Sequence, residues 1–304
     1  MLKQKLGNVD LSVGASGPGI DMSLYLLKKI TGTPVLQFVH GPVANSRTIA
    51  RCLVEADRVI YLESARQSLV GALQRLHSNG DKQLAAILED EKYQVLENGL
   101  ARDTWPRASR QDRPVILWAA SLLKWKGLDI LLDAIRDFDD DRPETHICYL
   151  RPKDTRLAVS DVVNDIPGVS WHESPGNLDD IRANASIFIS TSHREPFGLS
   201  ILEALAAGLC VVIPRDGAYW DRVLTDQGSC IKYCSGDADD LSQKIRYILE
   251  NRSDARRIGE RGQEIAARYR AEDVYRDITN TLVNWSPVNN ATRLPLCHSH
   301  DRGD

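Results

Sequence analysis

The sequence lacks the features that mark membrane-spanning, exported and repeat proteins. The 304-residue chain has no run of about 18 apolar residues, the length that a bilayer-spanning helix needs. Its first twenty residues lack the uninterrupted apolar core of a signal peptide. The six cysteines form no CxxC pair, and no internal repeat is visible. These absences favour a cytoplasmic protein with reduced cysteines.

The composition predicts a folded protein of two domains. Apolar residues make up 42% of the chain and charged residues 26%, a balance typical of globular proteins and not of disordered or fibrous ones. At roughly 100–200 residues per domain, the length predicts two domains. Residues 1–110 hold 14 Lys and Arg against 11 Asp and Glu. This small excess allows peripheral contact with the anionic inner face of a membrane, and we expect no nucleic acid partner.

Strand-like apolar runs alternate with helical segments along the whole chain. This alternation is typical of parallel sheets covered by helices on both faces. We therefore predict the α/β class, with two Rossmann-like parallel-sheet domains facing a cleft. Ligands of open α/β sheets bind beyond the carboxyl ends of the strands, so the cleft is the predicted site. The expected strands are VDLSVG, PVLQFV, ADRVIYL, YQVLE, PVILWAA, THICYL, ASIFIS, LCVVIP and SCIKY.

A seam between the two domains is visible at residues 98–114. This segment is rich in Arg, Asp and Pro and has no sustained apolar period. We expect a first domain over residues 1–108 and a second over 109–270. A helix over 271–284 is expected to pack back on the first domain, and residues 285–304 are expected to form a frayed tail.

The most informative segment is STSHREPFGLSILEALAAGLCVV, residues 190–212. It predicts a strand, a loop, and a helix that begins at about Leu199 and ends at Gly208. The backbone N–H groups of Phe197, Gly198 and Leu199 would be free at the helix start. Such groups favour an anion, so the segment predicts a phosphate or diphosphate site.

Two glutamates bracket this anion site. Glu195 lies in the loop, and Glu203 lies one turn inside the helix, eight positions later. Carboxylates at these positions would repel phosphate itself, but they accept hydrogen bonds from sugar hydroxyls on either side of it. The pattern therefore favours a sugar joined to a phosphate.

The residues from Glu195 to Glu203, EPFGLSILE, resemble the E-x7-E motif of retaining glycosyltransferases with the GT-B fold, group 1 or family 4. VILWAASLLKWKGLDILLDAI resembles the first strand, phosphate loop and helix of the C-terminal domain of that family. ANASIFISTSHREPFG, EALAAGLCVVIPRDGAYWDRVL and VLENGLARDTWP resemble three further segments of it. The resemblance runs from about residue 9 to 283 and is dense over 90–235.

The resemblance implies a role for several residues. Glu203 would hold the ribose hydroxyls of a sugar nucleotide, and Glu195 would lie near the 3- and 4-hydroxyls of the transferred sugar. Lys126 would neutralise the diphosphate and so stabilise the leaving group. His40, at the end of a strand in the first domain, would reach toward the sugar and the β-phosphate of the donor. The family usually needs no metal, and we expect no metal or cofactor beyond the donor substrate.

The sequence departs from the family at the phosphate loop. Most members carry an arginine five positions before the lysine, where this chain has Ser121. We expect donor binding to depend more heavily on Lys126, with Lys124 or Arg194 as compensating cations. The aspartates at 139–141, and the pair Asp179 and Asp180, are interpreted as solvated surface at helix ends.

A second departure concerns the first domain. In the family this domain begins with further strands and a glycine-rich loop before the segment that resembles VDLSVGASGPG. The domain is therefore expected to be truncated in its acceptor-binding part. An uncovered strand edge favours pairing with a partner chain or with a second copy.

These observations predict a function in polysaccharide biosynthesis. The expected reaction is transfer of a hexose-type sugar from a UDP- or GDP-sugar to a saccharide or lipid-linked saccharide, with retention of configuration. The alternative is a catalytically incompetent sugar-nucleotide-binding subunit that acts with a partner chain. An epimerase or phosphorylase on the same fold is a third possibility, which EPFGLSILE matches less closely.

Overall fold

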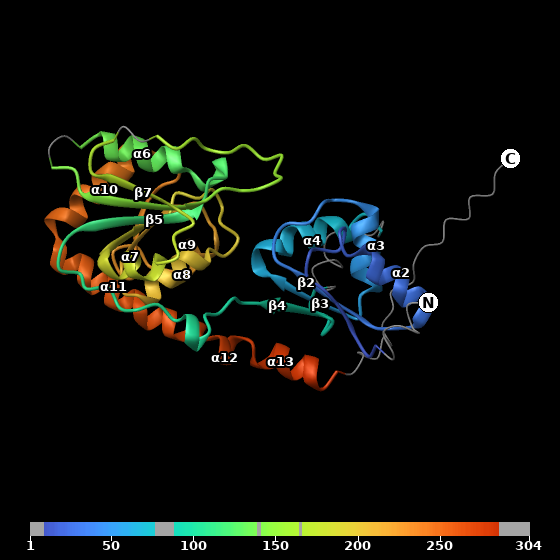
Figure 1. The fold of residues 1–304 in the computed structure, drawn as a ribbon. Coiled ribbons are helices and arrows are strands. Elements are labelled where there is room, and N and C mark those ends of the chain that lie inside the picture. Colours follow the sequence, from blue (N-terminus) through green and yellow to red (C-terminus); the bar gives the residue numbers. More distant parts are fainter. Residues whose placement is uncertain (1–8, 77–87, 139–140, 164–165, 286–304) are drawn as a thin grey trace. The chain divides into compact units, whose positions relative to one another are not determined.

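The structure is a computed structural model that describes residues 9–76, 88–138, 141–163 and 166–285 (Figure 1). It divides into two compact units. Unit 1 combines Met1–Glu97 with Tyr275–Asp304, and unit 2 is Asn98–Val274. The division falls at the first residue of the expected 98–114 seam, whereas the sequence placed it at 108/109. The expected tail lies outside the described residues except for Trp285.

Unit 1 contains a four-stranded parallel sheet. The strands follow one another across the sheet in chain order, and each pairs with the next in parallel. They are β1 (Ser12–Gly14), β2 (Val35–Val39), β3 (Arg58–Leu62) and β4 (Tyr93–Leu96). The helices are α2 (Met22–Thr31), α3 (Arg47–Glu55) and α4 (Arg66–Leu73). This agrees with the predicted α/β class.

One side of unit 1 presents apolar side chains to solvent. Leu26 and Ile30 lie four positions apart on α2, and they are 60% and 83% exposed. Tyr25 of the same helix is buried, and its hydroxyl donates to Gln37 Oε1 at 2.8 Å. Among the described residues, β1 pairs with β2 only. Association through this edge stays a prediction.

Unit 2 contains a six-stranded parallel sheet in the order β10-β9-β8-β5-β6-β7. The chain starts in the middle at β5, builds outward through β6 and β7, then returns to the other side of β5 for β8, β9 and β10. This order is the doubly wound arrangement, whose switch point lies between β5 and β8. The strands are β5 (Val115–Ser121), β6 (Glu144–Leu150), β7 (Val169–Glu173), β8 (Ile187–Ile189), β9 (Cys210–Arg215) and β10 (Ile231–Cys234).

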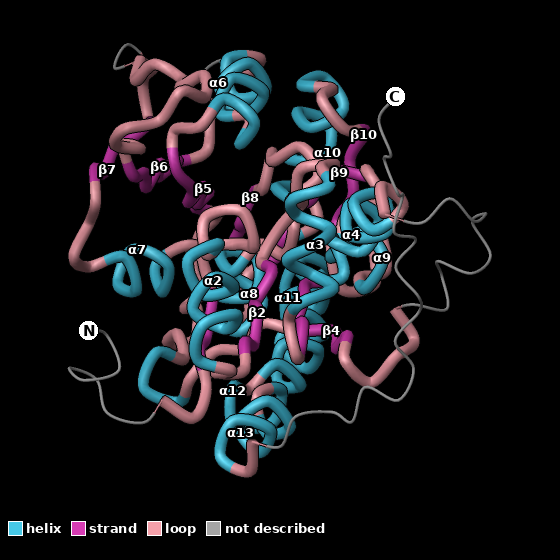
Figure 2. The backbone as a smooth tube through the Cα atoms, turned by 90° about the vertical axis from the view of Figure 1, so that its right-hand side faces the viewer, coloured by secondary structure: helices cyan, strands magenta, loops and turns pink. Residues whose placement is uncertain are grey.

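Helices cover the sheet of unit 2 in two pairs. One pair is α6 with α10 and the other is α8 with α11 (Figures 1 and 2). The first pair packs on a large core of buried apolar side chains that includes Trp118 and Leu131. The helices of unit 2 are α6 (Leu128–Arg136), α7 (Leu178–Asn184), α8 (Leu199–Ala206), α9 (Tyr219–Val223), α10 (Ala238–Glu250), α11 (Arg252–Ala266) and α12 (Ala271–Val274).

The expected helix over 271–284 is divided in two. Helix α12 ends at Val274, and α13 spans Arg276–Val283. The segment from Tyr275 onward belongs to unit 1. Just after α13, the Trp285 ring lies 6.0 Å from the Arg58 guanidinium of β3. This contact joins the end of the described chain to the sheet of unit 1.

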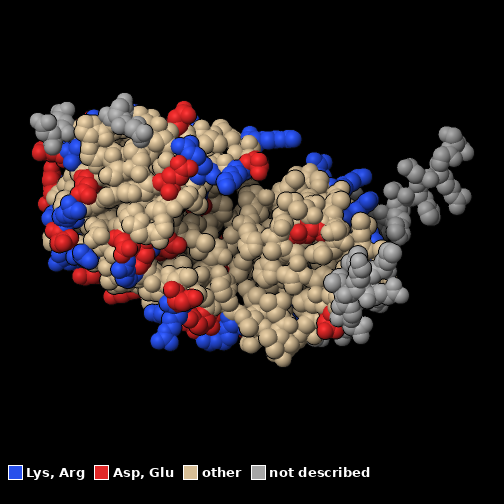
Figure 3. All heavy atoms as spheres, viewed as in Figure 1, with Lys and Arg blue, Asp and Glu red and all other residues tan. Residues whose placement is uncertain are grey.

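Charged side chains of both signs are interspersed on the visible face of unit 2 (Figure 3). Unit 2 also has exposed ion pairs, such as Arg113 with Glu144 at 2.5 Å and Arg136 with Asp133 at 2.8 Å. Opposite charges therefore offset one another on this face. Every helix of the described residues is too short or too polar to cross a bilayer.

Candidate active site

Two loops meet at the switch point of the sheet in unit 2. Strands β5 and β8 pair in parallel, with Ile116 opposite Ile187, so their carboxyl ends lie at the same edge. The loop after β5 runs over 122–127, and the loop after β8 runs over 190–198. Both are segments that the sequence singles out. The fold thus places the predicted phosphate loop beside the predicted anion site.

Hydrogen bonds and close packing join the two loops. The Thr191 hydroxyl donates to the Lys126 carbonyl at 2.8 Å, and the His193 amide donates to the Trp125 carbonyl at 2.9 Å. Gly127 follows Lys126 with φ at +68°, and a Cβ there would overlap the Thr191 carbonyl oxygen. Only glycine combines this backbone conformation with so close an approach. The position of Lys126 is therefore fixed from the β8 side.

Lys126 and Glu195 form an ion pair across the two loops. Lys126 Nζ lies 2.5 Å from Glu195 Oε2, and the two side chains are only 16% and 15% exposed. The same ammonium lies 4.1 Å from the centre of the Trp125 ring, a favourable cation–π contact. The cation assigned to the diphosphate thus contacts the carboxylate assigned to the sugar.

The start of α8 presents backbone amides beside this pair. Among the described residues, no acceptor contacts the N–H groups of Phe197, Gly198 and Leu199. Gly198 has φ at +82°, and a Cβ there would lie 2.9 Å from Glu195 Cγ. Free amides at a helix start favour an anion. The predicted diphosphate site therefore contains three N–H groups that have no acceptor among the described residues.

Aromatic packing holds the loop that carries these amides. Phe197 is buried, with 3% of the residue exposed. Its ring packs on those of Tyr219, Trp220 and Tyr269. The Trp220 Nε1–H donates to the Gly198 carbonyl at 3.3 Å. This cluster orients the turn into α8.

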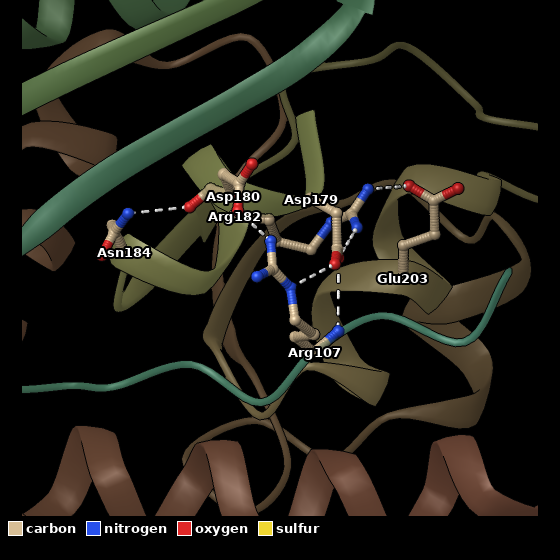
Figure 4. A network of polar contacts seen from close by, with 6 residues as sticks. All are labelled: Arg107, Asp179, Asp180, Arg182, Asn184 and Glu203. Carbon is tan, nitrogen blue, oxygen red and sulfur yellow. Dashed lines mark hydrogen bonds and ion pairs between the residues drawn. The ribbon is translucent and has the colours of Figure 1, made fainter. Parts of the chain in front are cut away.

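Glu203 is held by an arginine that the sequence reasoning missed. Arg182 Nη2 lies 2.5 Å from Glu203 Oε2, and the Arg182 side chain is only 8% exposed (Figure 4). Burial raises the pKa of the Glu203 carboxyl, and the Arg182 guanidinium opposes that rise. The two residues are 21 positions apart in the chain. Helix α7 has the sequence LDDIRAN, in which no local pattern marks the arginine as part of a site.

Asp179 and Asp180 lie in the first turn of α7 with side chains 41% and 56% exposed, as expected of surface residues at a helix end, and they also belong to the same network. Arg182 Nη1 lies 3.0 Å from Asp179 Oδ1, and Arg107 Nε lies 2.8 Å from Asp179 Oδ2. Arg107 also pairs with Asp180. The arginine hydrogen bonds lower the pKa of Asp179 against the opposing effect of burial. The carboxylates thus connect the segment before β5 to α7.

The remaining predicted residues lie in different places. Ser121 ends β5 and is half-buried. Lys124 pairs with Asp129 at 3.3 Å, and Arg194 is an exposed residue with φ at +49°. Compensation for the missing arginine by either cation stays a prediction.

His40 is part of unit 1, not unit 2. It follows β2 directly and is exposed, with its ring stacked on Phe38 at a centroid distance of 5.8 Å. The carboxyl end of a parallel strand is the expected place for a binding residue. Its reach toward a donor stays a prediction.

No group of three or more His, Cys, Asp and Glu side chains is placed to hold a metal within the described ranges. The described cysteines are all free, and Cys148, Cys210 and Cys230 are buried. Burial raises the pKa of each of these three thiols to about 12. They therefore act as apolar core residues and not as nucleophiles.

Comparison with known protein families gives one match that covers more than half of the chain. The family described as "Glycosyl transferases group 1" matches residues 101–265. The matched range contains Lys126, Glu195 and Glu203, and it lies within unit 2.

Three curated relatives are 25–28% identical to this chain over the aligned residues. The MMP alpha-(1->4)-mannosyltransferase of Mycolicibacterium hassiacum is 28% identical over 77% of this chain and 61% of its own length. The alpha-maltose-1-phosphate synthase of Mycobacterium tuberculosis is 26% identical, over 63% and 58%. The sulfoquinovosyl transferase SQD2 of Arabidopsis thaliana is 25% identical, over 52% and 31%. The chain thus spans less than two thirds of each of these relatives.

Solved structures with the same fold cover most of the chain. HepE from Anabaena in complex with UDP superposes with a TM-score of 0.71 at 18% identity, covering 93% of this chain and 81% of that one. Sucrose-phosphate synthase from Thermosynechococcus elongatus gives 0.69 at 16% identity, covering 93% and 75%. These neighbours confirm the predicted GT-B-like α/β fold.

Proposed function

The chain belongs to the glycosyl transferases of group 1, and we propose that it transfers a hexose-type sugar from a UDP- or GDP-sugar to a saccharide or lipid-linked saccharide, with retention of configuration. The observation that carries this proposal is the Lys126–Glu195 ion pair beside the free amides at the start of α8. A cation, unpaired N–H groups and a carboxylate together suit a sugar diphosphate.

The proposal assigns Lys126 and the α8 amides to the diphosphate. When the bond between the sugar C1 and the β-phosphate oxygen breaks, negative charge grows on the leaving nucleoside diphosphate. An ammonium and N–H groups already aimed at that position stabilise this charge without reorganisation. Glu195, once separated from Lys126, accepts hydrogen bonds from the sugar hydroxyls. Glu203, on the next turn of α8, accepts a ribose hydroxyl.

UDP-sugars are the first donors to test. HepE, a neighbour in fold, was solved with UDP and with UDP-glucose. We propose UDP-glucose as the initial probe and GDP-mannose as the second. The donor site needs no metal in this proposal, because Lys126 and the amides supply the positive charge.

A titration of the full chain with UDP, GDP, UDP-glucose and GDP-mannose tests donor binding. We expect either UDP and UDP-glucose or GDP and GDP-mannose to bind. Lys126→Ala should weaken that binding at least tenfold, because a charge-assisted contact to phosphate is lost. Lys244→Ala is the matched control, because Lys244 lies on α10 and pairs with Asp240 at 3.4 Å. Absence of nucleotide binding, or equal affinity in Lys126→Ala, contradicts the proposal.

Radiolabelled donor mixed with glycan and lipid-linked acceptors tests transfer. NMR of the product determines whether the anomeric configuration is retained. Donor binding with neither transfer nor slow donor hydrolysis favours the alternative, a sugar-nucleotide-binding subunit that acts with a partner chain.

A further inference from the structure

We propose that Arg182 is a positioning residue that fixes one oxygen of Glu203 and thereby presents the other to a ribose hydroxyl of the donor. The inference rests on the proposed function, because it concerns the nucleotide end of the same site. It adds a residue that touches neither donor nor acceptor but determines how the ribose is recognised.

The two oxygens of Glu203 have different surroundings. Oε2 accepts from Arg182 Nη2 at 2.5 Å, whereas Oε1 has no hydrogen-bond partner among the described residues. The second oxygen points away from Arg182 in Figure 4. The Glu203 side chain is 28% exposed, so a ligand can reach it. One oxygen is therefore occupied and the other is free to accept.

Arg182 is itself held in place by a second carboxylate. Its Nη1 lies 3.0 Å from Asp179 Oδ1, so one planar guanidinium joins a residue of α7 to a residue of α8. With 8% of its side chain exposed, it has little room to move. A lysine at this position carries one compact ammonium and lacks the rigid fork that spans both carboxylates.

The segment before β5 supports Asp179 in turn. Arg107 donates to both oxygens of Asp179, from its backbone N–H at 3.2 Å and from its Nε at 2.8 Å. Two more backbone bonds fix the segment, Ser109 N–H to the Ala207 carbonyl at 2.8 Å and Arg110 N–H to the Ala183 carbonyl at 3.0 Å. The chain thus lies against the ends of both helices, and the network is anchored outside the donor site.

Charge explains why the arginine matters for recognition. The charged groups that act on Glu203 are Arg182, which favours its ionised form, and Asp179, which opposes it. Without Arg182, Glu203 is a buried carboxyl beside another carboxylate, which favours the neutral form. A neutral carboxyl accepts a hydroxyl hydrogen bond more weakly than an ionised one. Loss of Arg182 should therefore weaken recognition of the ribose specifically.

The test uses calorimetry to compare the affinity of the full chain for UDP with its affinity for 2′-deoxy-UDP and 3′-deoxy-UDP. If GDP is the nucleotide that binds, GDP and its 2′-deoxy and 3′-deoxy forms are used instead. We expect the wild type to prefer the ribonucleotide about tenfold over at least one deoxy form, the size of a charge-assisted hydrogen bond. In Arg182→Met the preference should fall to less than threefold. Arg182→Lys should recover part of it.

Arg136→Met is the matched control. Arg136 is an exposed arginine on α6 that pairs with Asp133 three positions earlier. The substitution removes a guanidinium from the same unit and should leave the preference for the ribonucleotide unchanged. A purely structural role of Arg182 would lower stability and all three affinities together, so it would not alter the ratio.

Each outcome decides the inference. A folded Arg182→Met chain, verified by circular dichroism, that keeps the wild-type preference overturns it. If Arg182→Met does not fold, Arg182→Lys carries the test, and an unchanged preference in that variant overturns the inference. Equal affinity of the wild type for UDP and both deoxy forms also overturns it while leaving nucleotide binding intact. No binding of any nucleotide overturns both the inference and the proposed function.

Discussion

Lys126 Nζ and Glu195 Oε2 lie 2.5 Å apart, although a bound donor would require one beside phosphate and the other beside sugar hydroxyls. The pair stabilises the two loops in the absence of donor, because each charge is largely removed from water. Under the proposed function, a sugar diphosphate enters between them and replaces one ion pair by two sets of contacts. Donor binding would then require this pair to separate.

Glu195→Gln should separate nucleotide binding from transfer. The amide removes the charge that competes for Lys126, so affinity for UDP alone should rise about fivefold, equivalent to roughly 1 kcal/mol. Transfer from UDP-glucose should fall, because the carboxylate that accepts the sugar hydroxyls is lost. Calorimetry with UDP and a transfer assay measure the two effects. Weaker UDP binding in the variant would show that Glu195 supports the diphosphate and does not compete with it.

Gly127→Ala should destabilise unit 2 and abolish nucleotide binding. The new Cβ would overlap the Thr191 carbonyl at a positive φ. Strain at such a backbone position costs about 1–3 kcal/mol, and the loop that carries Lys126 must move. Urea denaturation measures the cost. Gly176→Ala is the control, because a Cβ there meets nothing within 4 Å and the backbone is not in the positive-φ region. An equal midpoint for both variants would refute the packing argument.

The pair His146 and His172 should make unit 2 sensitive to mild acid. Their rings bond at 2.9 Å between Nδ1 and Nε2, and His146 also bonds Glu144 at 3.1 Å. Burial, and then the charge of His146, lower the pKa of His172. The folded state therefore binds this proton less readily than the unfolded chain, whose histidine has a pKa of about 6.5. The free energy of unfolding should fall as the pH drops through about 6.5 toward the lowered pKa, and stay constant above that window.

Melting temperatures at pH 7.5 and 5.5 check this sign. His172→Gln should show a smaller drop between the two pH values than the parent, because the glutamine takes up no proton. His40→Gln, at an exposed position of unit 1, should drop as the parent does. A His172→Gln chain with an undiminished drop would assign the acid sensitivity to other groups.

The sequence predicted what depends on local pattern and missed what depends on distant contacts. Helix α8 was foreseen because its apolar positions recur at helical spacing and Gly208 follows its end. Strand β7 was missed, since it lies at the edge of the sheet and its residues are half-buried or exposed instead of forming an apolar run. A half-covered strand gives no continuous apolar signal.

The charge network of the site shows the same limit. The positions of Lys126 and Glu195 follow from two strand ends that meet at a switch point, so the fold class alone brings them close. The bond between Arg182 and Glu203 joins α7 to α8 across the sheet edge, and no spacing in the chain encodes it. The bond between Asp179 and Arg107 spans 72 positions of the chain and has no local signal either, whereas Arg182 is only three positions from Asp179.

The exposed face of α2 offers a test of the expected association. Leu26 and Ile30 are 60% and 83% exposed, so replacing both by Glu removes little buried area. The free energy of unfolding should change by less than about 0.5 kcal/mol per site. Tyr25→Ala, on the buried side of the same helix, should cost about 3 kcal/mol or more, because it leaves a cavity and removes the bond to Gln37.

The exposed apolar face of α2 also bears on association. An apolar face beside a strand edge that has no partner among the described residues favours a second copy of the chain. Sedimentation should therefore depend on concentration in the parent and not in the double variant. A parent that stays monomeric at all concentrations contradicts self-association, and a double variant that unfolds would show that this face is covered in the folded protein.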